Sequence, residues 1–206
     1  SYAGGRRGGT VSALALSPAY DDDRTVFAAT AAGIYRSLDG GRSWLAGNRG
    51  IVHPLIVSVV PSPEFAKDRT VFAACQEGGL MRSLDSGETW EPLSDWSRVS
   101  SVMTVAVSPN YGVDGTIFAG TEADGVFRTT DRGRSWSPTN FGILDLAVMA
   151  LALSPEFGRD GTAFVATTSG LYRSRNGGRA WREVDLGLED VSTQAVAISP
   201  SYAFDR

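Results

Sequence analysis

An internal repeat of about 45 residues constrains the fold of this chain more than any other feature. A Ser-Pro pair recurs five times, at steps of 45, 46, 46 and 45 residues. In each copy an aromatic residue follows two positions after the proline, and an aspartate follows three positions further on. A tryptophan closes each of the first four copies, at Trp44, Trp90, Trp136 and Trp181. A repeat of this length indicates small modules that bury their cores by stacking on their neighbours.

Within one copy the residue pattern is that of short β-strands. In the first copy, residues 11–16 form an apolar run that ends at a Ser-Pro pair, and residues 21–23 form a polar turn. Residues 25–30 are rich in β-formers, and two more short strands are expected over 34–37 and 43–46. Four short antiparallel strands in every copy are typical of a β-propeller blade. A β-sandwich is the alternative, but its strands would not repeat so regularly.

The sequence therefore predicts an all-β chain, a β-propeller with four complete four-stranded antiparallel blades and one extra strand over 191–198. A single blade cannot bury both of its faces, so such an arc belongs to a larger propeller, or several copies close a ring together. In the second case the open blade edge would mediate self-association. The expected boundaries are an N-terminal tail over 1–10, blade 1 over 11–50, blade 2 over 51–97, blade 3 over 98–142, blade 4 over 143–188, and the first strand of an incomplete blade 5 over 189–206.

The turn before each tryptophan carries a specific motif. In the first three copies it reads Ser/Thr-x-Asp-x-Gly-x-Ser/Thr-Trp, and in the fourth Asn176 and Ala180 replace the aspartate and the hydroxyl residue. The motif resembles the Asp-box, or bacterial neuraminidase repeat, of the β-propellers in sialidases, xyloglucanases, sortilin and photosystem II assembly factors. The resemblance implies that these residues cap and seal the blade; a catalytic or metal-binding role is the alternative. The residues concerned are Asp39, Trp44, Asp85, Trp90, Asp131, Trp136, Asn176 and Trp181.

If the repeated residues are structural, function should lie where the copies differ. The turns between second and third strands and the connections between blades share one face, on which propellers usually bind ligands. The candidate ligand-binding residues there are Arg49, His53, Gln76, Glu77, Trp96, Arg98, Glu122 and Asp124.

Two of these candidates have competing interpretations. Trp96 is the only tryptophan outside the repeated turns. If exposed, it would stack on a sugar or anchor a protein partner, and otherwise it packs over its own blade. His53 is the only histidine, and a polar filler at the blade junction is favoured over a catalytic base.

An arginine follows an aromatic residue or a methionine in every third strand, at Arg36, Arg82, Arg128 and Arg173. Sialidases use convergent arginines against a substrate carboxylate, which gives these residues one functional interpretation. Because the arginine recurs in every blade, a contact between blades or with the Asp-box is favoured. The Phe/Tyr-Arg-Ile-Pro motif of sialidases is absent from the sequence.

Composition excludes several other functions. The net charge is −4 and the isoelectric point about 5.0, so no basic excess points to nucleic acid. No apolar run approaches the roughly 20 residues of a membrane-spanning helix. The single cysteine and single histidine exclude a cysteine-rich metal site and a two-histidine zinc motif. We expect neither a metal nor a cofactor.

The favoured function is a non-catalytic scaffold that binds a protein or a glycan. The alternative is a fragment of a propeller glycoside hydrolase of the sialidase or xyloglucanase type, in which Glu77, Glu122 and Asp124 could supply acids. The family and the acidic isoelectric point favour an extracytoplasmic or secreted location.

Overall fold

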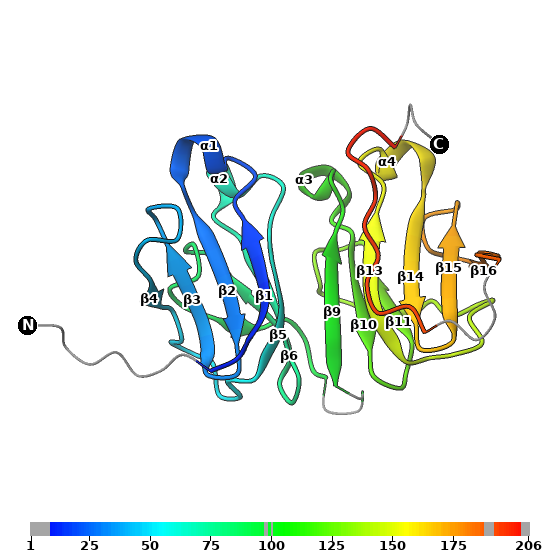
Figure 1. Cartoon of the computed structure of the whole chain (residues 1–206), viewed down its shortest axis with the longest axis horizontal. Helices are drawn as coiled ribbons and strands as arrows, with labels where there is room; N and C mark the ends of the chain where they lie inside the picture. Colours follow the sequence, from blue (N-terminus) through cyan, green and yellow to red (C-terminus); the bar gives the residue numbers. More distant parts are fainter. Residues whose placement is uncertain (1–8, 97–98, 100, 188–191, 203–206) are drawn as a thin grey trace, which may run out of the picture. The chain divides into compact units, whose positions relative to one another are not determined.

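The computed structural model describes residues 9–96, 99, 101–187 and 192–202. The chain divides into two compact units, unit 1 (Ser1–Pro92) and unit 2 (Leu93–Arg206), and each contains two four-stranded sheets. We number these sheets as blades 1 to 4 in chain order. In each sheet every strand pairs antiparallel with its neighbours (Figure 1).

The strands of each blade follow one another in chain order across the sheet. Unit 1 contains β1 (Val11–Leu16), β2 (Val26–Thr30), β3 (Gly33–Ser37) and β4 (Leu45–Ala46) in blade 1, and β5 (Ile56–Pro61), β6 (Val71–Cys75), β7 (Gly79–Ser83) and β8 (Glu91–Pro92) in blade 2. Unit 2 contains β9 (Val102–Val107), β10 (Ile117–Thr121), β11 (Val126–Thr129) and β12 (Ser137–Pro138) in blade 3, and β13 (Val148–Leu153), β14 (Ala163–Thr167), β15 (Gly170–Ser174) and β16 (Arg182–Glu183) in blade 4.

The loops that follow the first strands, here called the Ser-Pro loops, each contain one helical turn. These turns are α1 (Tyr20–Asp23), α2 (Phe65–Asp68), α3 (Tyr111–Asp114) and α4 (Phe157–Asp160). In the first loop the Ser17 hydroxyl donates to Asp23 Oδ2 at 2.6 Å, and Asp23 Oδ1 accepts from the Thr25 N–H at 2.8 Å. The same pair of bonds recurs at Asp68, Asp114 and Asp160. The repeated aspartate therefore caps its own loop.

The core of each unit lies between its two blades. In unit 1, Phe27 and Ile34 of blade 1 are buried together with Ile56, Val71 and Trp90 of blade 2. The Phe27 ring meets the Phe65 ring of the next Ser-Pro loop edge-on at 5.5 Å, and Phe118 meets Phe157 in the same way in unit 2 at 5.7 Å. Stacking of the two blades in each unit thus buries apolar side chains that a single sheet would leave exposed.

The extra strand expected over 191–198 is not formed in the described residues 192–198. One backbone bond, from the Thr193 N–H to the Thr167 carbonyl at 3.1 Å, joins this segment to β14. A first strand is held by a ladder to the second strand of its own blade, and the described residues supply no such partner. Residue 191 lies outside the described part of the chain.

Candidate functional site

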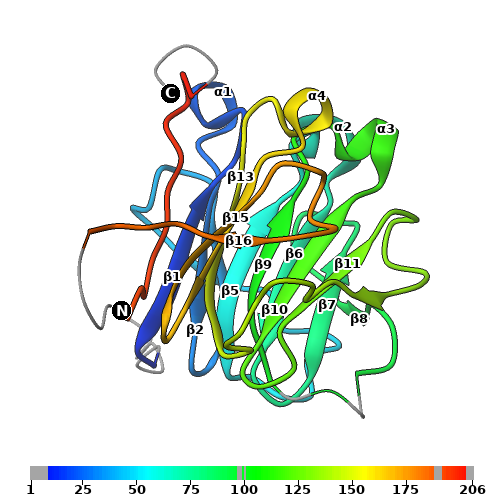
Figure 2. The same ribbon diagram turned by 90° about the vertical axis from the view of Figure 1, so that its right-hand side faces the viewer.

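The two ends of each blade carry different kinds of loop. The Ser-Pro loop and the turn that precedes the tryptophan, here called the tryptophan turn, lie at one end. The Gly40 N–H joins them by donating to the Arg24 carbonyl at 2.9 Å, and the other three blades repeat this bond. The turns between second and third strands and the connections between blades lie at the opposite end, here called the connection end. Figure 2 shows α3 and α4 at the same end of the unit 2 strands.

The aspartates of the tryptophan turns are engaged by their own turns. Asp39 Oδ1 accepts the N–H groups of Arg42 and Ser43 at 2.9 Å each, and Oδ2 accepts the Ser43 hydroxyl at 2.6 Å. These bonds, the Ser43 hydroxyl foremost, hold the pKa of Asp39 well below its usual range. The Ser135 hydroxyl does the same for the pKa of Asp131. Each carboxylate is thus held ionised and cannot donate a proton as a general acid near neutral pH.

The pKa of Asp85 in blade 2 is lowered in the same way. Desolvation raises its pKa, but hydrogen bonds from the Thr89 hydroxyl and N–H, with others from Ser83 and Glu88, outweigh it and lower the pKa to about 2. In blade 4, Asn176 Oδ1 accepts from the Ser174 hydroxyl at 2.9 Å and from the Arg179 and Ala180 N–H groups at 3.1 and 3.0 Å. An amide therefore preserves the turn without the charge.

The four tryptophans form two kinds of contact. The Trp90 indole donates to the Gly47 carbonyl at 2.9 Å, and the Trp181 indole donates to the Thr139 carbonyl at 2.7 Å. Both bonds join the second blade of a unit to the first. Trp44 and Trp136 instead donate to a glycine carbonyl within their own turns, at 3.1 and 3.2 Å. The tryptophan of the second blade therefore connects the blades of each unit.

Sequence reasoning missed a second connector between the blades. Asn48 Oδ1 accepts from the Ile34 N–H, and Asn140 Oδ1 accepts from the Val126 N–H, both at 2.7 Å. The carbonyl of the residue after each asparagine accepts from the backbone N–H of the tryptophan in the following blade. These bonds join Arg49 to Trp90 at 2.8 Å and Phe141 to Trp181 at 2.9 Å. The following glycine has no room for a side chain, since a Cβ on Gly50 would lie 2.1 Å from the Trp90 carbonyl oxygen. The shared Asn-x-Gly-Ile sequence over 48–51 and 140–143 was the available signal.

Three candidate ligand residues of unit 1, His53, Gln76 and Glu77, lie at its connection end, whereas the backbone of Arg49 pairs with Thr89 in the tryptophan turn of blade 2. His53 Nδ1 lies 3.5 Å from Glu77 Oε2, and both side chains are exposed. Gln76 precedes Glu77 in the β6–β7 turn, and Arg49 lies exposed in the connection between blades 1 and 2. The structure therefore brings His53 and Glu77 together and leaves the Arg49 side chain in solvent.

In unit 2 the candidates have different environments. Glu122 is exposed in the β10–β11 turn, and the Asp124 carbonyl accepts from the Asn140 amide at 2.9 Å. Trp96 is only 9% exposed, with its ring 5.0 Å from that of Trp136 and 5.8 Å from that of Phe127. Trp96 is therefore packed and not exposed, and the expectation that it packs over its own blade is corrected in one respect. The ring covers blade 3 rather than its own blade, because an apolar surface is available there. Arg98 lies outside the described residues.

The third-strand arginines do not share one set of partners. Arg36 donates to the Ser86 carbonyl at 2.7 Å and to Glu88 Oε1 at 3.0 Å, both in the tryptophan turn of blade 2. This is the contact between blades that the repeat favoured. Arg82 instead pairs with Glu91 of its own blade at 2.6 Å.

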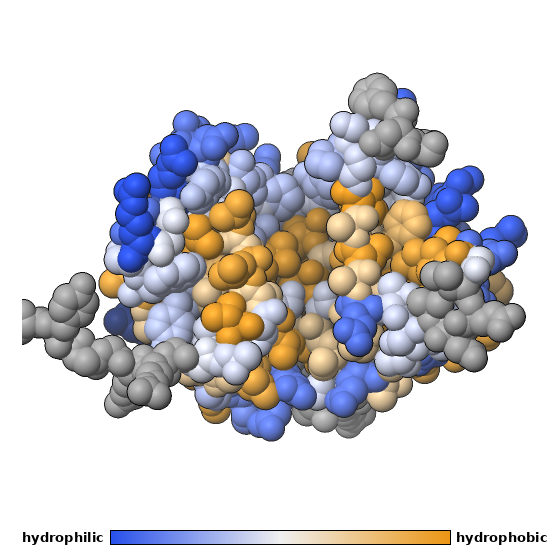
Figure 3. Space-filling model, viewed as in Figure 1, coloured by the Kyte–Doolittle hydropathy of each residue, from blue (hydrophilic) through white to orange (hydrophobic). Residues whose placement is uncertain are grey.

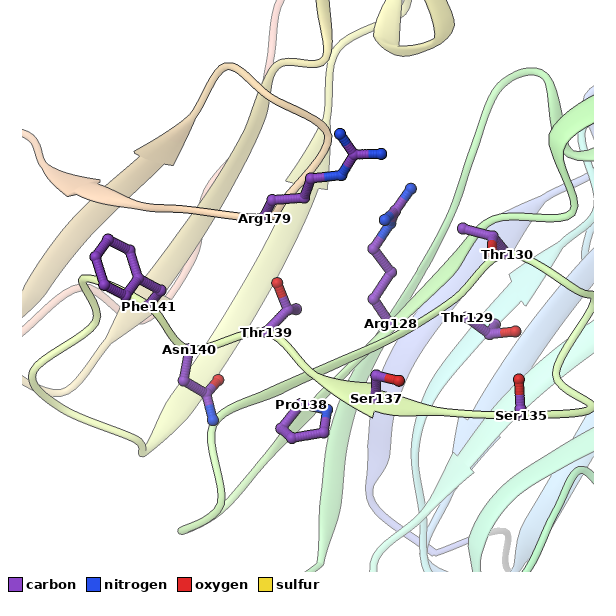
Figure 4. Close-up of a pocket in the computed structure, with 10 residues that line it drawn as sticks. All are labelled: Arg128, Thr129, Thr130, Ser135, Ser137, Pro138, Thr139, Asn140, Phe141 and Arg179. Carbon is purple, nitrogen blue, oxygen red and sulfur yellow. The ribbon is translucent and has the colours of Figure 1, made fainter.

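Arg128 faces a hollow of about 360 Å³ in unit 2, shown in Figure 4. Arg179, Ser137, Thr139 and Phe141 also line it. Burial lowers the pKa of Arg128, the positive charge of Arg179 lowers it further, and Asp114 opposes both effects. The hollow therefore carries an excess of positive charge on its walls.

Two searches of the described residues gave negative results. No cluster of three or more histidine, cysteine, aspartate or glutamate side chains in this part of the chain could hold a metal ion. The helices described in the structure are all too short to span a membrane.

Comparison with known proteins supports the fold. No family model and no curated protein matches the sequence. Among solved structures, the chain is similar to the GH74 xyloglucanase from Xanthomonas campestris, with a TM-score of 0.67 and 20% identity over 89% of this chain and 31% of that one. It is also similar to the extracellular domain of the putative sensor BT4673 from B. thetaiotaomicron, with a TM-score of 0.66 and 15% identity over 91% and 23%.

A third similar structure is that of YCF48 bound to a D1 peptide. Its TM-score is 0.57 and its identity 16%, over 86% of this chain and 54% of that one. This chain spans about a quarter to a half of the proteins it resembles. The match to propeller structures, together with four antiparallel four-stranded sheets, shows that the fold is a β-propeller.

Proposed function

We propose that this chain is part of an Asp-box β-propeller that binds a protein or a glycan as a non-catalytic scaffold. One observation carries the proposal: the repeated aspartates are committed to hydrogen bonds inside their own loops and turns. Asp39 accepts four such bonds, and the aspartates of the Ser-Pro loops accept bonds from their own loops in all four blades. The recurring acidic chemistry therefore stabilises the blades and is not available to a substrate.

The binding surface in this proposal is the connection end of the blades. In unit 1 it presents His53, Gln76 and Glu77 in short turns, and Arg49 lies exposed between this end and the tryptophan turn of blade 2. In unit 2, Glu122 and Asp124 occupy the corresponding turn. Short rigid turns that differ between blades suit recognition, since each blade offers different chemistry on a common frame. The D1 peptide bound by YCF48 is a precedent for a protein ligand on a similar propeller.

A fragment of a glycoside hydrolase is the second candidate. The similarity to a GH74 xyloglucanase and the exposed carboxylate of Glu122 favour it. Glycoside hydrolysis normally needs two carboxyl groups on either side of the scissile bond. This chain corresponds to 31% of that xyloglucanase, so the second acid would come from other blades. Both candidates agree with an extracytoplasmic location, as the extracellular domain of BT4673 also suggests.

The two candidates are separated by binding and activity measurements on the same protein. We expect the chain to bind members of an array of glycans and peptides, and Glu77→Lys at the connection end to change that binding. Glu64→Lys makes the same charge change in unit 1 but lies directly before α2, in a Ser-Pro loop, and should leave binding unchanged.

Xyloglucan hydrolysis by the chain, abolished by Glu122→Gln, would overturn the scaffold proposal in favour of the enzyme. Binding that changes equally in Glu77→Lys and Glu64→Lys would show that the connection end is not the binding surface.

A further inference from the structure

The two units contain the same junction between blades with one change of charge. Arg128 of blade 3 occupies the position that Arg36 occupies in blade 1, directly before the tryptophan turn. In the tryptophan turn of the next blade, Glu88 stands in unit 1 where Arg179 stands in unit 2. An arginine–glutamate pair at 3.0 Å in unit 1 is thus replaced by two arginines in unit 2.

The guanidinium of Arg128 lacks the carboxylate partner that Arg36 has. Its Nε is buried without a hydrogen-bond partner, and its Cζ lies 5.8 Å from the centroid of the Phe118 ring. Among the described residues no carboxylate lies within ion-pairing distance of Arg128 or Arg179. Asp114 influences Arg128 from further away, and its own oxygens accept from the Ser108 hydroxyl and the Thr116 N–H. A partly buried cation without a partner is costly, and a bound anion would relieve that cost.

The hollow offers few polar groups besides the two arginines. The Thr139 hydroxyl donates to the Gly178 carbonyl, and the Asn140 amide bonds to the Asp124 carbonyl and the Val126 N–H. The Ser135 hydroxyl donates to Asp131. Figure 4 shows the Arg128 and Arg179 side chains with their guanidinium ends toward one another above these groups. The two arginines are therefore the charged donors that remain for a ligand, and the Ser137 and Thr130 hydroxyls line the same hollow.

The geometry points to an anion-binding site between Arg128 and Arg179, in which an oxyanion takes the place that the Glu88 carboxylate has in unit 1. Guanidinium groups bind carboxylate, phosphate and sulfate groups by paired charge-assisted hydrogen bonds. The hollow is large enough for such a group together with part of the molecule that carries it. The inference does not depend on whether the chain is a scaffold or part of an enzyme, because the site lies in a tryptophan turn rather than at the connection end.

The site is tested by calorimetry at constant ionic strength, with sulfate, phosphate, glucuronate and N-acetyl-aspartate as probes. We expect at least one probe to bind, and Arg179→Glu to weaken that binding at least tenfold, since it rebuilds the internal ion pair of unit 1. Glucuronate and N-acetyl-aspartate carry the carboxylate on a sugar and on a peptide unit, so their relative affinities distinguish the two sources. Arginine Nε–Hε resonances should shift at Arg128 on binding and report the location directly.

Two further variants control for charge and for the junction itself. Arg42→Glu makes the same charge change at the same turn position in blade 1, and it should leave binding unchanged. Glu88→Arg should create a second site with Arg36 and add one bound ion per chain. The inference is overturned if none of the four probes binds, if Arg179→Glu binds as the wild type does, or if Arg42→Glu weakens binding equally.

Discussion

The carboxylate of Asp85 couples the stability of one turn to pH. Its pKa is lowered from 3.8 to about 2 in the folded chain, so its stabilising contribution is complete above about pH 4 and disappears as the pH falls through about 2. By analogy with helix caps, we expect Asp85→Asn to reduce the free energy of unfolding by about 1 kcal/mol or less at pH 7, because solvent screens this half-buried group. Urea denaturation of both proteins between pH 7 and pH 2 should show the difference shrinking toward zero.

We expect Asp85→Asn to destabilise the chain only mildly, because Asn176 shows that an amide fits the equivalent turn of blade 4. The matched control is Asp22→Asn, whose side chain in α1 has no hydrogen-bond partner among the described residues. We expect Asp22→Asn to match the wild type at every pH. A stability difference for Asp85→Asn that stays constant down to pH 2 would show that the charge of this carboxylate does not stabilise the turn.

At the scale of the element, the tryptophan turns differ in what they connect. Trp90 is 5% exposed and donates to the Gly47 carbonyl of the preceding blade, whereas Trp44 is 38% exposed and donates within its own turn. Trp90→Phe leaves a buried carbonyl without its donor and should cost about 2 kcal/mol of unfolding free energy. Trp44→Phe should cost less than about 1 kcal/mol, since water can replace the lost bond. Chemical denaturation of both variants measures the unfolding free energy that each loses. Equal losses in the two variants would contradict a connecting role for Trp90.

The strands and the blade repeat could be predicted because their signals are local. Alternating apolar residues, the Ser-Pro pairs and the motif of the tryptophan turns each lie within a few positions. The structure differs from the prediction where contacts between residues far apart in the sequence determine the position of a side chain. Trp96 is buried by Trp136, and Asn48 caps β3 from the following connection. The four-residue helical turns were also missed, since one turn is too short to show helical periodicity.

The candidate site illustrates the same limit of sequence reasoning. The arginine of each third strand was expected to contact a neighbouring blade or its Asp-box, and Arg36 does so. The positive charge of the hollow at Arg128 comes from Arg179, which stands in blade 4 where Glu88 stands in blade 2. The sequence does not show this pairing, because only the stacking of the blades brings Arg128 and Arg179 together. Arg49 and the connection-end residues Gln76, Glu77, Glu122 and Asp124 stay predictions for binding.

At the scale of the whole molecule, one face of blade 1 indicates how the chain associates. Leu14 and Leu16 of β1 are 65% and 57% exposed, and Figure 3 shows the apolar surface over this strand. Val59 occupies the position of Leu14 in blade 2 and is only 3% exposed, because blade 1 covers it. The face of β1 thus has the chemistry of a surface that another blade covers.

Blade 4 of a second copy is the occupant we expect on that face. It carries Phe164 and Leu171 where blade 1 carries Phe27 and Ile34, which pack against blade 2. The Tyr202 ring of the same chain meets Phe164 edge-on at 6.2 Å, so this C-terminal segment would move aside or form part of the contact. Contact between these two different surfaces would join copies head to tail. Sedimentation velocity should therefore show concentration-dependent association, reduced in the Leu14→Ser, Leu16→Ser double variant. Val113→Ser removes a fully solvated apolar side chain from α3 and should leave association unchanged. A wild-type chain that stays monomeric at all concentrations would contradict self-association and indicate that a different protein segment covers β1.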